Sequence, residues 1–395
     1  MKERLWTRSY IMAVTVMFGI YMVSSILLSV MAIHAKNLTG LDIYAGMMVS
    51  TFTLGALSVR FLAGALIDRF SSKKIILAGL AILVIGSLWL LIGKDITAIL
   101  FARVLQGIGF GLSATATSTM IAMICHPSRL LEGISYNAVV QSLTAVLGPS
   151  LGFWIIGAEY NQFSTLFLLA TGIAVATFFI MSFEKNASIT DKTHPMIQEH
   201  SKPIAWSLIC LSILVLFMNA LSQSAITSFL ALYAISMNLV GVGSFFSINA
   251  VGMITSRFIM NRLVKRYGEL PMILMNTIIF GGSVLLLTQA SSLLHMLVLA
   301  FPAGFAMGSI APIINTYLVQ TLPGNKKGLA NALYFSSLDI GYMLGSIFWG
   351  LIATKLGYVP IFYLSAILQG LAILITLLQM RLLRKNNTGV ILEAK

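Results

Sequence analysis

The stretch Gly64-Ala-Leu-Ile-Asp-Arg-Phe-Ser-Ser-Lys-Lys74 determines how the rest of the chain can be organised. It follows a long apolar run, turns through Asp68 and Arg69, and leads into another long apolar run at Ile75. A short charged turn between two such runs is typical of a helical hairpin whose bend lies at a membrane surface.

The same hairpin returns about half a chain later. Arg60-Phe61 is echoed by Arg257-Phe258, an offset of 197 residues (257 − 60) in a chain of 395. The same offset relates three pairs of glycines, Gly107 and Gly304, Gly111 and Gly308, and Gly148 and Gly345. A common offset predicts two similar membrane domains with a binding site near the bilayer midplane, at the interface between them.

Composition places the chain in a membrane. Hydrophobic residues make up 58% of the sequence and charged residues 9%, whereas soluble domains contain about 25% charged residues. Backbone polar groups in lipid must be paired within the protein, which leaves helices or a closed β-barrel. Barrel strands alternate over about ten residues, but the apolar runs here are continuous. We therefore predict an all-α membrane protein.

The net charge of +13 does not indicate a nucleic-acid partner, because the cations lie in short segments between apolar runs and form no basic face. The sequence also contains no metal-spaced acidic or His-rich cluster, no nucleotide-binding loop and no nucleophile constellation. We therefore expect no enzyme activity, no metal and no cofactor.

Twelve apolar runs are long enough to span a bilayer, which takes about 20 residues. They cover residues 9–34, 44–67, 75–93, 97–124, 130–156, 162–183, 204–236, 240–261, 270–290, 292–321, 328–353 and 358–380. The one long polar segment, residues 185–203, predicts a cytoplasmic linker. It would join two six-helix bundles at residues 1–184 and 204–395.

The distribution of Lys and Arg predicts the orientation, because these residues accumulate in cytoplasmic loops. With the N-terminus inside, nineteen of them lie in inside segments and three, Lys36, Lys94 and Lys355, lie in outside segments. We therefore expect a multi-pass protein of the cell membrane with both termini in the cytoplasm.

Three motifs resemble those of the major facilitator superfamily, and the resemblance extends over essentially the whole chain. Gly64-x-Leu66-x-Asp68-Arg69 with Lys73-Lys74 is similar to the family's motif between its second and third helices, although Ser71 and Ser72 replace its Gly-Arg pair. Arg103-x-x-Gln106-Gly107-x-Gly109 resembles the fourth-helix motif of proton-coupled members.

The third motif, Gly148-Pro149-x-x-Gly152, resembles the fifth-helix motif of drug and metabolite antiporters. Thr144 and Phe153 stand where that motif has glycine, which is a departure from the pattern. The resemblance implies twelve transmembrane helices in two pseudo-symmetric six-helix bundles that work by alternating access.

Asp339 is the one carboxylate expected near mid-membrane, in the eleventh span. Charged side chains inside a membrane are costly and are therefore candidates for function. A carboxyl held between burial and a nearby cation can exchange a proton near neutral pH, so we predict a proton-coupling role. By resemblance the second and eleventh helices are neighbours, which makes Arg60 the expected partner. A permanent structural ion pair is the alternative.

Arg103 is a second charged residue inside a span and a further candidate for proton coupling. A permanent cation there can repel a proton from a nearby acid or hold an anionic group of a substrate. In the alternative, its side chain extends outward to the membrane surface.

Five amide side chains are candidates for the substrate cavity: Gln106, Asn137, Gln141, Asn219 and Gln223. The last two are four residues apart and hence lie on one face of a helix. Such side chains either contact a ligand or bond neighbouring helices to each other.

Eight residues are candidates for gating: Gly64, Asp68, Arg69, Glu132, Gly148, Pro149, Gly152 and Arg257. Asp68 can cap the N-terminus of a neighbouring helix, which by resemblance is the eleventh span. Glu132 can pair with cations at the end of the eighth span. Pro149 removes a backbone hydrogen bond and permits a kink, and Gly148 with Gly152 gives a smooth face that we expect to meet the eighth span.

These observations predict a monomeric secondary transporter that exports a small molecule, either a drug-like compound or a metabolite, driven by proton influx. Metabolite uptake by proton symport or uniport is the alternative on the same fold. A membrane-embedded enzyme or a receptor is a third interpretation. The missing catalytic constellations disfavour an enzyme, and a receptor does not need two matched halves.

Overall fold

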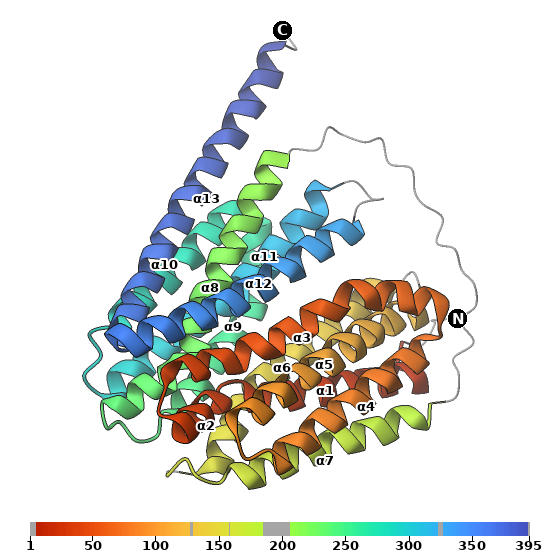
Figure 1. The fold of residues 1–395 in the computed structure, drawn as a ribbon. Coiled ribbons are helices and arrows are strands. Elements are labelled where there is room, and N and C mark those ends of the chain that lie inside the picture. The colour runs from red at the N-terminus through yellow and green to blue at the C-terminus, as the bar shows by residue number, and fades with distance from the viewer. Residues whose placement is uncertain (1–4, 127–128, 158, 185–205, 323–326, 394–395) are drawn as a thin grey trace. The chain divides into compact units, whose positions relative to one another are not determined.

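The computed structural model describes residues 5–393 except 127–128, 158, 185–205 and 323–326. The predicted linker at residues 185–203 lies outside the described residues. Within them the chain forms thirteen α-helices and no β-strand (Figure 1). The prediction of an all-helical fold is confirmed.

The helices follow one another with short connections. The first half contains α1 (Arg8–Leu28), α2 (Val30–Thr39), α3 (Asp42–Arg69), α4 (Ser72–Ile92), α5 (Ile96–Ile124), α6 (Leu130–Ile156) and α7 (Phe163–Ser182). The second half contains α8 (Trp206–Ser236), α9 (Gly243–Tyr267), α10 (Glu269–Leu287), α11 (Leu293–Thr321), α12 (Lys327–Leu356) and α13 (Val359–Glu393).

The predicted first span, residues 9–34, consists of two consecutive helices. α1 ends at Leu28 and α2 begins at Val30. Ser29 between them keeps near-helical backbone angles (φ −86°, ψ −23°). α2 ends at Thr39, and the next residue, Gly40, has the positive φ of 72° that commonly terminates a helix.

Eleven of the described helices are long and apolar enough to cross a membrane. The other two are α2, which has 10 residues, and α9, which corresponds to the predicted eighth span. α9 carries Arg257 in its interior and Lys265 and Arg266 in its last turn, so its composition is more polar than that of the other spans. Each of the remaining predicted spans matches one of the eleven helices.

The two halves use the same helix packing, which confirms the internal repeat. A Cβ atom placed on Gly107 of α5 would lie 2.9 Å from the carbonyl carbon of Phe52 on α3. A Cβ atom placed on Gly304 of α11 would lie 2.5 Å from the carbonyl carbon of Asn249 on α9. The contacted residues are separated by the same 197 positions (249 − 52) as the glycines (304 − 107).

The facing helices repeat the pattern from their side. A Cβ atom on Gly55 of α3 would meet the backbone nitrogen of Ile108 at 3.1 Å, and one on Gly252 of α9 would meet that of Phe305 at 2.8 Å. Both pairs are again related by 197 residues (252 − 55 and 305 − 108). Backbone contact at equivalent glycines therefore fixes α3 against α5 and α9 against α11.

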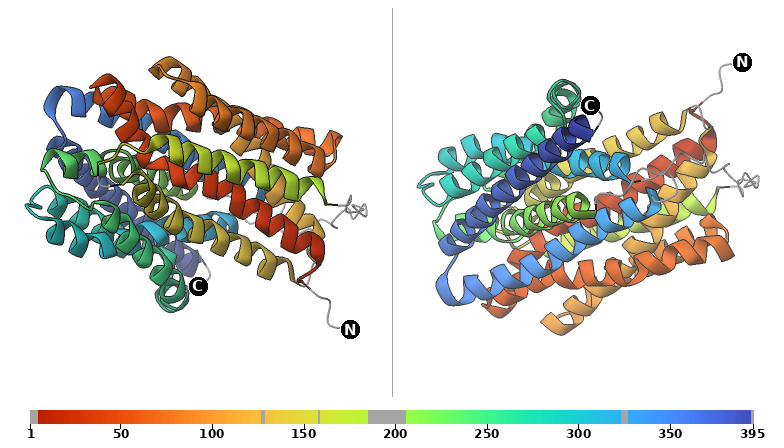
Figure 2. Two further views of the ribbon diagram at one scale, coloured as in Figure 1. Left: turned by 90° about the horizontal axis from the view of Figure 1, so that it is seen from below. Right: turned by 90° about the horizontal axis from the view of Figure 1, so that it is seen from above.

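Contacts divide the described chain into two compact units. Unit 1 comprises Met1–Thr193, Thr227–Ser247 and Ser346–Thr354, and unit 2 comprises His194–Ile226, Ile248–Gly345 and Lys355–Lys395. In unit 1, α5 lies against both α3 and α4 (Figure 2), and apolar side chains of α1, α3, α4, α5 and α7 form a core. In unit 2, α10 lies against α11 and α13. The division into bundles at residues 1–184 and 204–395 stays a prediction.

Candidate functional site

Arg103 of α5 is fully buried in unit 1 and is held by neutral groups. Its Nε donates to the carbonyl oxygen of Met48 at 3.1 Å, and its Nη1 donates to Oε1 of Gln106 at 2.9 Å. The guanidinium also lies over the ring of Phe52, 4.6 Å from the centroid. With 0% of its surface exposed, Arg103 does not extend to the membrane surface, so that alternative is wrong.

The hydrogen bonds of Arg103 continue through Gln106 to α4. Gln106 Nε2 donates to Ser87 Oγ at 3.1 Å, and Gly86 lets the two helices approach, since a Cβ there would lie 2.9 Å from Gln106 Cγ. Arg103 Nη2 has no hydrogen-bond partner among the described residues. A buried cation that neutral dipoles satisfy only in part is suited to attract a carboxylate or an anionic group.

A second polar cluster links α8 to α12 in unit 2. Gln223 Nε2 donates to Asn219 Oδ1, as the four-residue spacing of this pair predicts. The hydroxyl of Tyr342 on α12 donates to Gln223 Oε1 at 2.8 Å. The sequence alone does not indicate Tyr342, because its hydrogen bond depends on which helices pack together. The only local signal is its position three residues after Asp339.

Asp339 and Arg60, the predicted ion pair, are both half-buried. Asp339 lies in unit 2 on α12, within one turn of Tyr342, and Arg60 lies in unit 1 on α3. Their pairing stays a prediction.

The predicted gating residues of the inner hairpin lie near the end of α3. Gly64 and Asp68 are within this helix, and Arg69 is its exposed last residue. Arg257 is exposed on α9. The side chains of Asp68 and Glu132 fall outside the described part of the structure, so their capping and pairing stay predictions.

Asn137 and Gln141 lie one turn apart on α6. Asn137 is buried and Gln141 is half-buried. The carbonyl oxygen of Gln141 accepts a hydrogen bond from Thr144 Oγ1 at 2.9 Å, whereas Asn137 Oδ1 has no partner among the described residues. Their contact with a substrate stays a prediction.

Gly148 and Gly152 face α1, so the expectation that they meet the eighth span is wrong. A Cβ on Gly148 would lie 2.7 Å from the carbonyl carbon of Ser25, and one on Gly152 would lie 2.5 Å from the carbonyl oxygen of Ile26. Glycines show that another backbone comes close but not which one. α6 continues through Pro149 from Leu130 to Ile156.

Other residues of α6 do contact the start of α9, and all of them lie in unit 1. Ser150 Oγ and Ser247 Oγ are 2.9 Å apart. The ring of Phe153 stacks on that of Phe246, with 5.0 Å between centroids and 18° between planes. A Cβ on Gly243 would lie 2.8 Å from Phe153 Cβ. Phe153, which stands where the resembled motif has glycine, thus supplies an aromatic contact.

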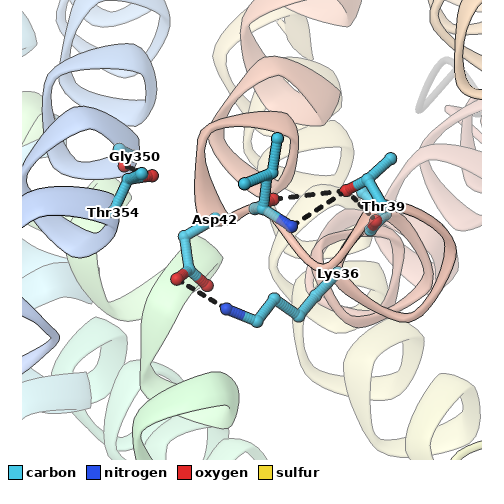
Figure 3. A network of polar contacts seen from close by, with 7 residues as sticks. Lys36, Thr39, Asp42, Gly350 and Thr354 are labelled. Carbon is cyan, nitrogen blue, oxygen red and sulfur yellow. Dashed lines mark hydrogen bonds and ion pairs between the residues drawn. The ribbon is translucent and has the colours of Figure 1, made fainter.

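An ion pair in unit 1 joins the end of α2 to the start of α3 (Figure 3). Lys36 Nζ lies 2.6 Å from Asp42 Oδ2. The negative charge of Asp42, in the first turn of α3, also interacts favourably with the positive end of the helix dipole. Gly350 of α12 lies beside this turn, since a Cβ there would be 3.1 Å from Cα of Ile43. This segment would lie on the outer side in the predicted orientation.

Comparison with known sequences finds distant relatives whose similarity extends over most of the chain. Quinolone resistance protein NorA of Staphylococcus aureus (strain MSSA476) is 22% identical over 349 residues, which cover 84% of this chain and 87% of that protein. The MFS-type transporter MJ1560 of Methanocaldococcus jannaschii is 25% identical over 369 residues, covering 91% of this chain and 93% of that protein.

Solved structures share the fold at lower identity. The nucleoside transporter NupG superposes with a TM-score of 0.74 at 9% identity, covering 94% of this chain and 100% of that one. A bacterial homologue of the human lysosomal transporter Spinster gives a TM-score of 0.76 at 14% identity, covering 95% and 97%.

The sequence model of the Major Facilitator Superfamily matches residues 11–245 and 212–392. These two segments overlap and together cover nearly the whole chain. This agrees with the spanning helices, the 197-residue repeat and the three motifs. The chain therefore belongs to the major facilitator superfamily and is a multi-pass membrane transporter of small molecules.

Proposed function

We propose that this transporter exports a small molecule by alternating access and couples export to proton influx. The observation that carries the proposal is Asp339, a half-buried carboxylate inside α12, a helix apolar enough to span a membrane. A charged carboxylate at that depth is costly, and binding a proton removes the charge. Asp339 can therefore carry a proton from one side of the membrane to the other.

Two cations, Arg60 and Arg103, supply the opposing charge in this proposal. Arg60 pairs with Asp339 in one access state and parts from it in the other. Arg103 is a fixed cation on neutral partners, so its field favours the deprotonated form of any carboxylate that comes near it. Asp339 would then release its proton when the transporter changes its access state and the carboxylate comes close to a cation.

Export is the favoured direction because several sequence relatives are quinolone resistance proteins. A transporter confers resistance when it removes the compound from the cell. The excess of Lys and Arg in the predicted inside segments supports a location in the cell membrane with both termini in the cytoplasm. We assign the inner hairpin with Asp68, and Glu132 on α6, to the cytoplasmic gate.

Everted membrane vesicles with an acidic interior test the proposal, with a fluorescent fluoroquinolone as the probe. The wild type should accumulate the probe, and an uncoupler should abolish accumulation. Asp339→Asn should reduce gradient-driven accumulation to background, while exchange of the probe down its own gradient continues. This combination distinguishes loss of proton coupling from loss of the fold.

Glu159→Gln is the matched control, because Glu159 is an exposed acid in a loop, and its carboxylate accepts a hydrogen bond from the nearby Asn161 at 2.8 Å. It should behave as the wild type. Gradient-driven accumulation by Asp339→Asn at the wild-type rate would show that the coupling role is wrong. Expulsion of the probe from wild-type vesicles by the same gradient would indicate uptake by symport.

A further inference from the structure

The cluster on α8 and α12 has a defined direction of hydrogen bonding. The amide oxygen of Gln223 can only accept, so the Tyr342 hydroxyl must use its single proton in the 2.8 Å bond to Oε1. The amide nitrogen of Gln223 in turn donates to Asn219 Oδ1. The hydroxyl oxygen of Tyr342 can therefore offer only lone pairs to a further group.

Close packing of the two helices keeps this arrangement in place. A Cβ on Gly341 of α12 would lie 2.7 Å from Ala220 Cβ and 2.9 Å from the carbonyl oxygen of Phe217, both on α8. One turn before Gly341, Ser337 Oγ donates to the carbonyl oxygen of Ile213 at 3.0 Å. With the backbones locked at this spacing, the three polar side chains are confined to a narrow range of positions.

The three members differ in how far they can be reached. Asn219 is 0% exposed and Gln223 is 6% exposed, whereas Tyr342 is half-buried. Tyr342 is thus the member through which the cluster can touch another molecule. Asp339, also half-buried, lies three residues earlier on α12, so the two side chains are neighbours along the helix.

We propose that Tyr342 is a specificity-determining residue of the transport site, and that it selects molecules carrying an N–H or O–H donor. Asn219 and Gln223 are positioning residues that hold the hydroxyl so that it accepts. The neighbouring carboxylate of Asp339 favours the same donors, because a carboxylate also accepts hydrogen bonds and attracts protonated nitrogen. This inference rests on the proposed function and adds a substrate class to it.

The buried end of the cluster explains why two amides are needed. Asn219 Oδ1 receives the Gln223 amide nitrogen and so fixes which end of Gln223 faces Tyr342. Asn219 Nδ2 has no partner among the described residues, which is an unfavourable arrangement for a buried donor. Removing Asn219 would let Gln223 rotate and present its N–H to Tyr342, which would free the hydroxyl proton to donate.

Equilibrium binding to the full-length chain in lipid nanodiscs tests the inference with two fluorescent cations. Rhodamine 123 carries N–H donors, and tetramethylrhodamine methyl ester has the same charge and ring system with every nitrogen methylated. The wild type should bind rhodamine 123 more tightly. Tyr342→Phe should weaken that binding about three- to tenfold, the worth of one hydrogen bond, and leave the methylated dye unchanged.

Tyr363→Phe on α13 is the matched control, since Tyr363 is exposed, and it should preserve the preference. Asn219→Leu should abolish the preference through the orientation of Gln223. Equal affinity of the wild type for both dyes, binding of neither, or equal weakening of both by Tyr342→Phe would overturn the inference. Binding is independent of direction and coupling, so these outcomes are separate from a failure of proton-driven export in vesicles.

Discussion

The two halves of the chain place different chemistry at the same point of the same scaffold. In the first half Arg103 of α5 lies over the ring of Phe52 on α3, 4.6 Å from its centroid. In the second half the equivalent positions hold Ala300 and Asn249 (300 − 103 and 249 − 52 both equal 197). There Asn249 Nδ2 donates to the carbonyl oxygen of Ala300 at 3.2 Å.

This difference shows how the duplicated halves can specialise. Glycines about one turn from these pairs bring the backbones into close contact in both halves, although the side chains at positions 103 and 300 differ. One half keeps a buried permanent cation there, and the other keeps a neutral amide. The second half instead carries a polar cluster on α8 and α12, where Asn219, Gln223 and Tyr342 are bonded together.

The largest expected effect comes from breaking the scaffold that the halves share. Gly107→Ala and Gly304→Ala each push a methyl group into the backbone of the facing helix, and backbone cannot move aside as a side chain can. Each should destabilise the protein by about 1–3 kcal/mol or more. Thermal unfolding in detergent measures this destabilisation, and the midpoint should fall by a similar amount in the two variants.

Gly172→Ala in α7 and Gly282→Ala in α10 are matched controls, one in each half, because a Cβ at either position meets nothing within 4 Å. They should leave the midpoint unchanged or raise it slightly, since alanine favours helix. If Gly107→Ala were tolerated as well as Gly172→Ala, the packing described for α3 and α5 would be wrong.

The next largest effect concerns the cation itself. Arg103→Ala removes the donors to Met48 and Gln106, and it leaves the buried side-chain oxygen of Gln106 without the guanidinium as its donor. An unsatisfied buried polar group costs about 1–3 kcal/mol. We expect lower stability, measured by thermal unfolding, together with loss of gradient-driven transport in vesicles.

A double variant uses the second half as the template for repair. Arg103→Ala with Phe52→Asn installs in α3 and α5 the pair that α9 and α11 already contain. It should recover part of the stability lost in Arg103→Ala, because the introduced amide would donate to the carbonyl oxygen of residue 103 as Asn249 does to that of Ala300. Transport should remain lost, since the cation is absent. Recovery of coupled transport would show that the charge has no role.

The sequence predicted features that depend on local spacing. Helix length and the 197-residue offset follow from hydrophobic runs and repeated residues, and the structure reproduces both. Two details differ from the prediction: the first span is divided at Ser29, and α9 is not among the helices that are apolar enough to span a membrane. The four-residue spacing of Asn219 and Gln223 also placed them on one helix face, in agreement with their hydrogen bond.

Features that depend on which helices meet were not predictable in the same way. Gly148 and Gly152 signalled a close neighbour, but that neighbour is α1. No sequence pattern singles out Tyr342, and its hydrogen bond to Gln223 depends on the close packing of α12 on α8 at Gly341. The sequence of one helix indicates which of its faces is small or polar, whereas the choice of packing partner depends on the sequences of both helices.

The smallest expected change in stability concerns a position at which the two halves carry different residues. Thr144 of α6 and Gly341 of α12 are equivalent (341 − 144 = 197). The Thr144 hydroxyl bonds a carbonyl of its own helix, that of Gln141 at 2.9 Å. Thr144→Ala should therefore change stability by less than about 1 kcal/mol, and the thermal midpoint should barely move. Gly341→Ala should lower it more, because its methyl group would lie 2.7 Å from Ala220 Cβ. Equal losses would mean that α1 approaches α6 at Thr144 as closely as α8 approaches α12, and the two halves would be more alike than their sequences.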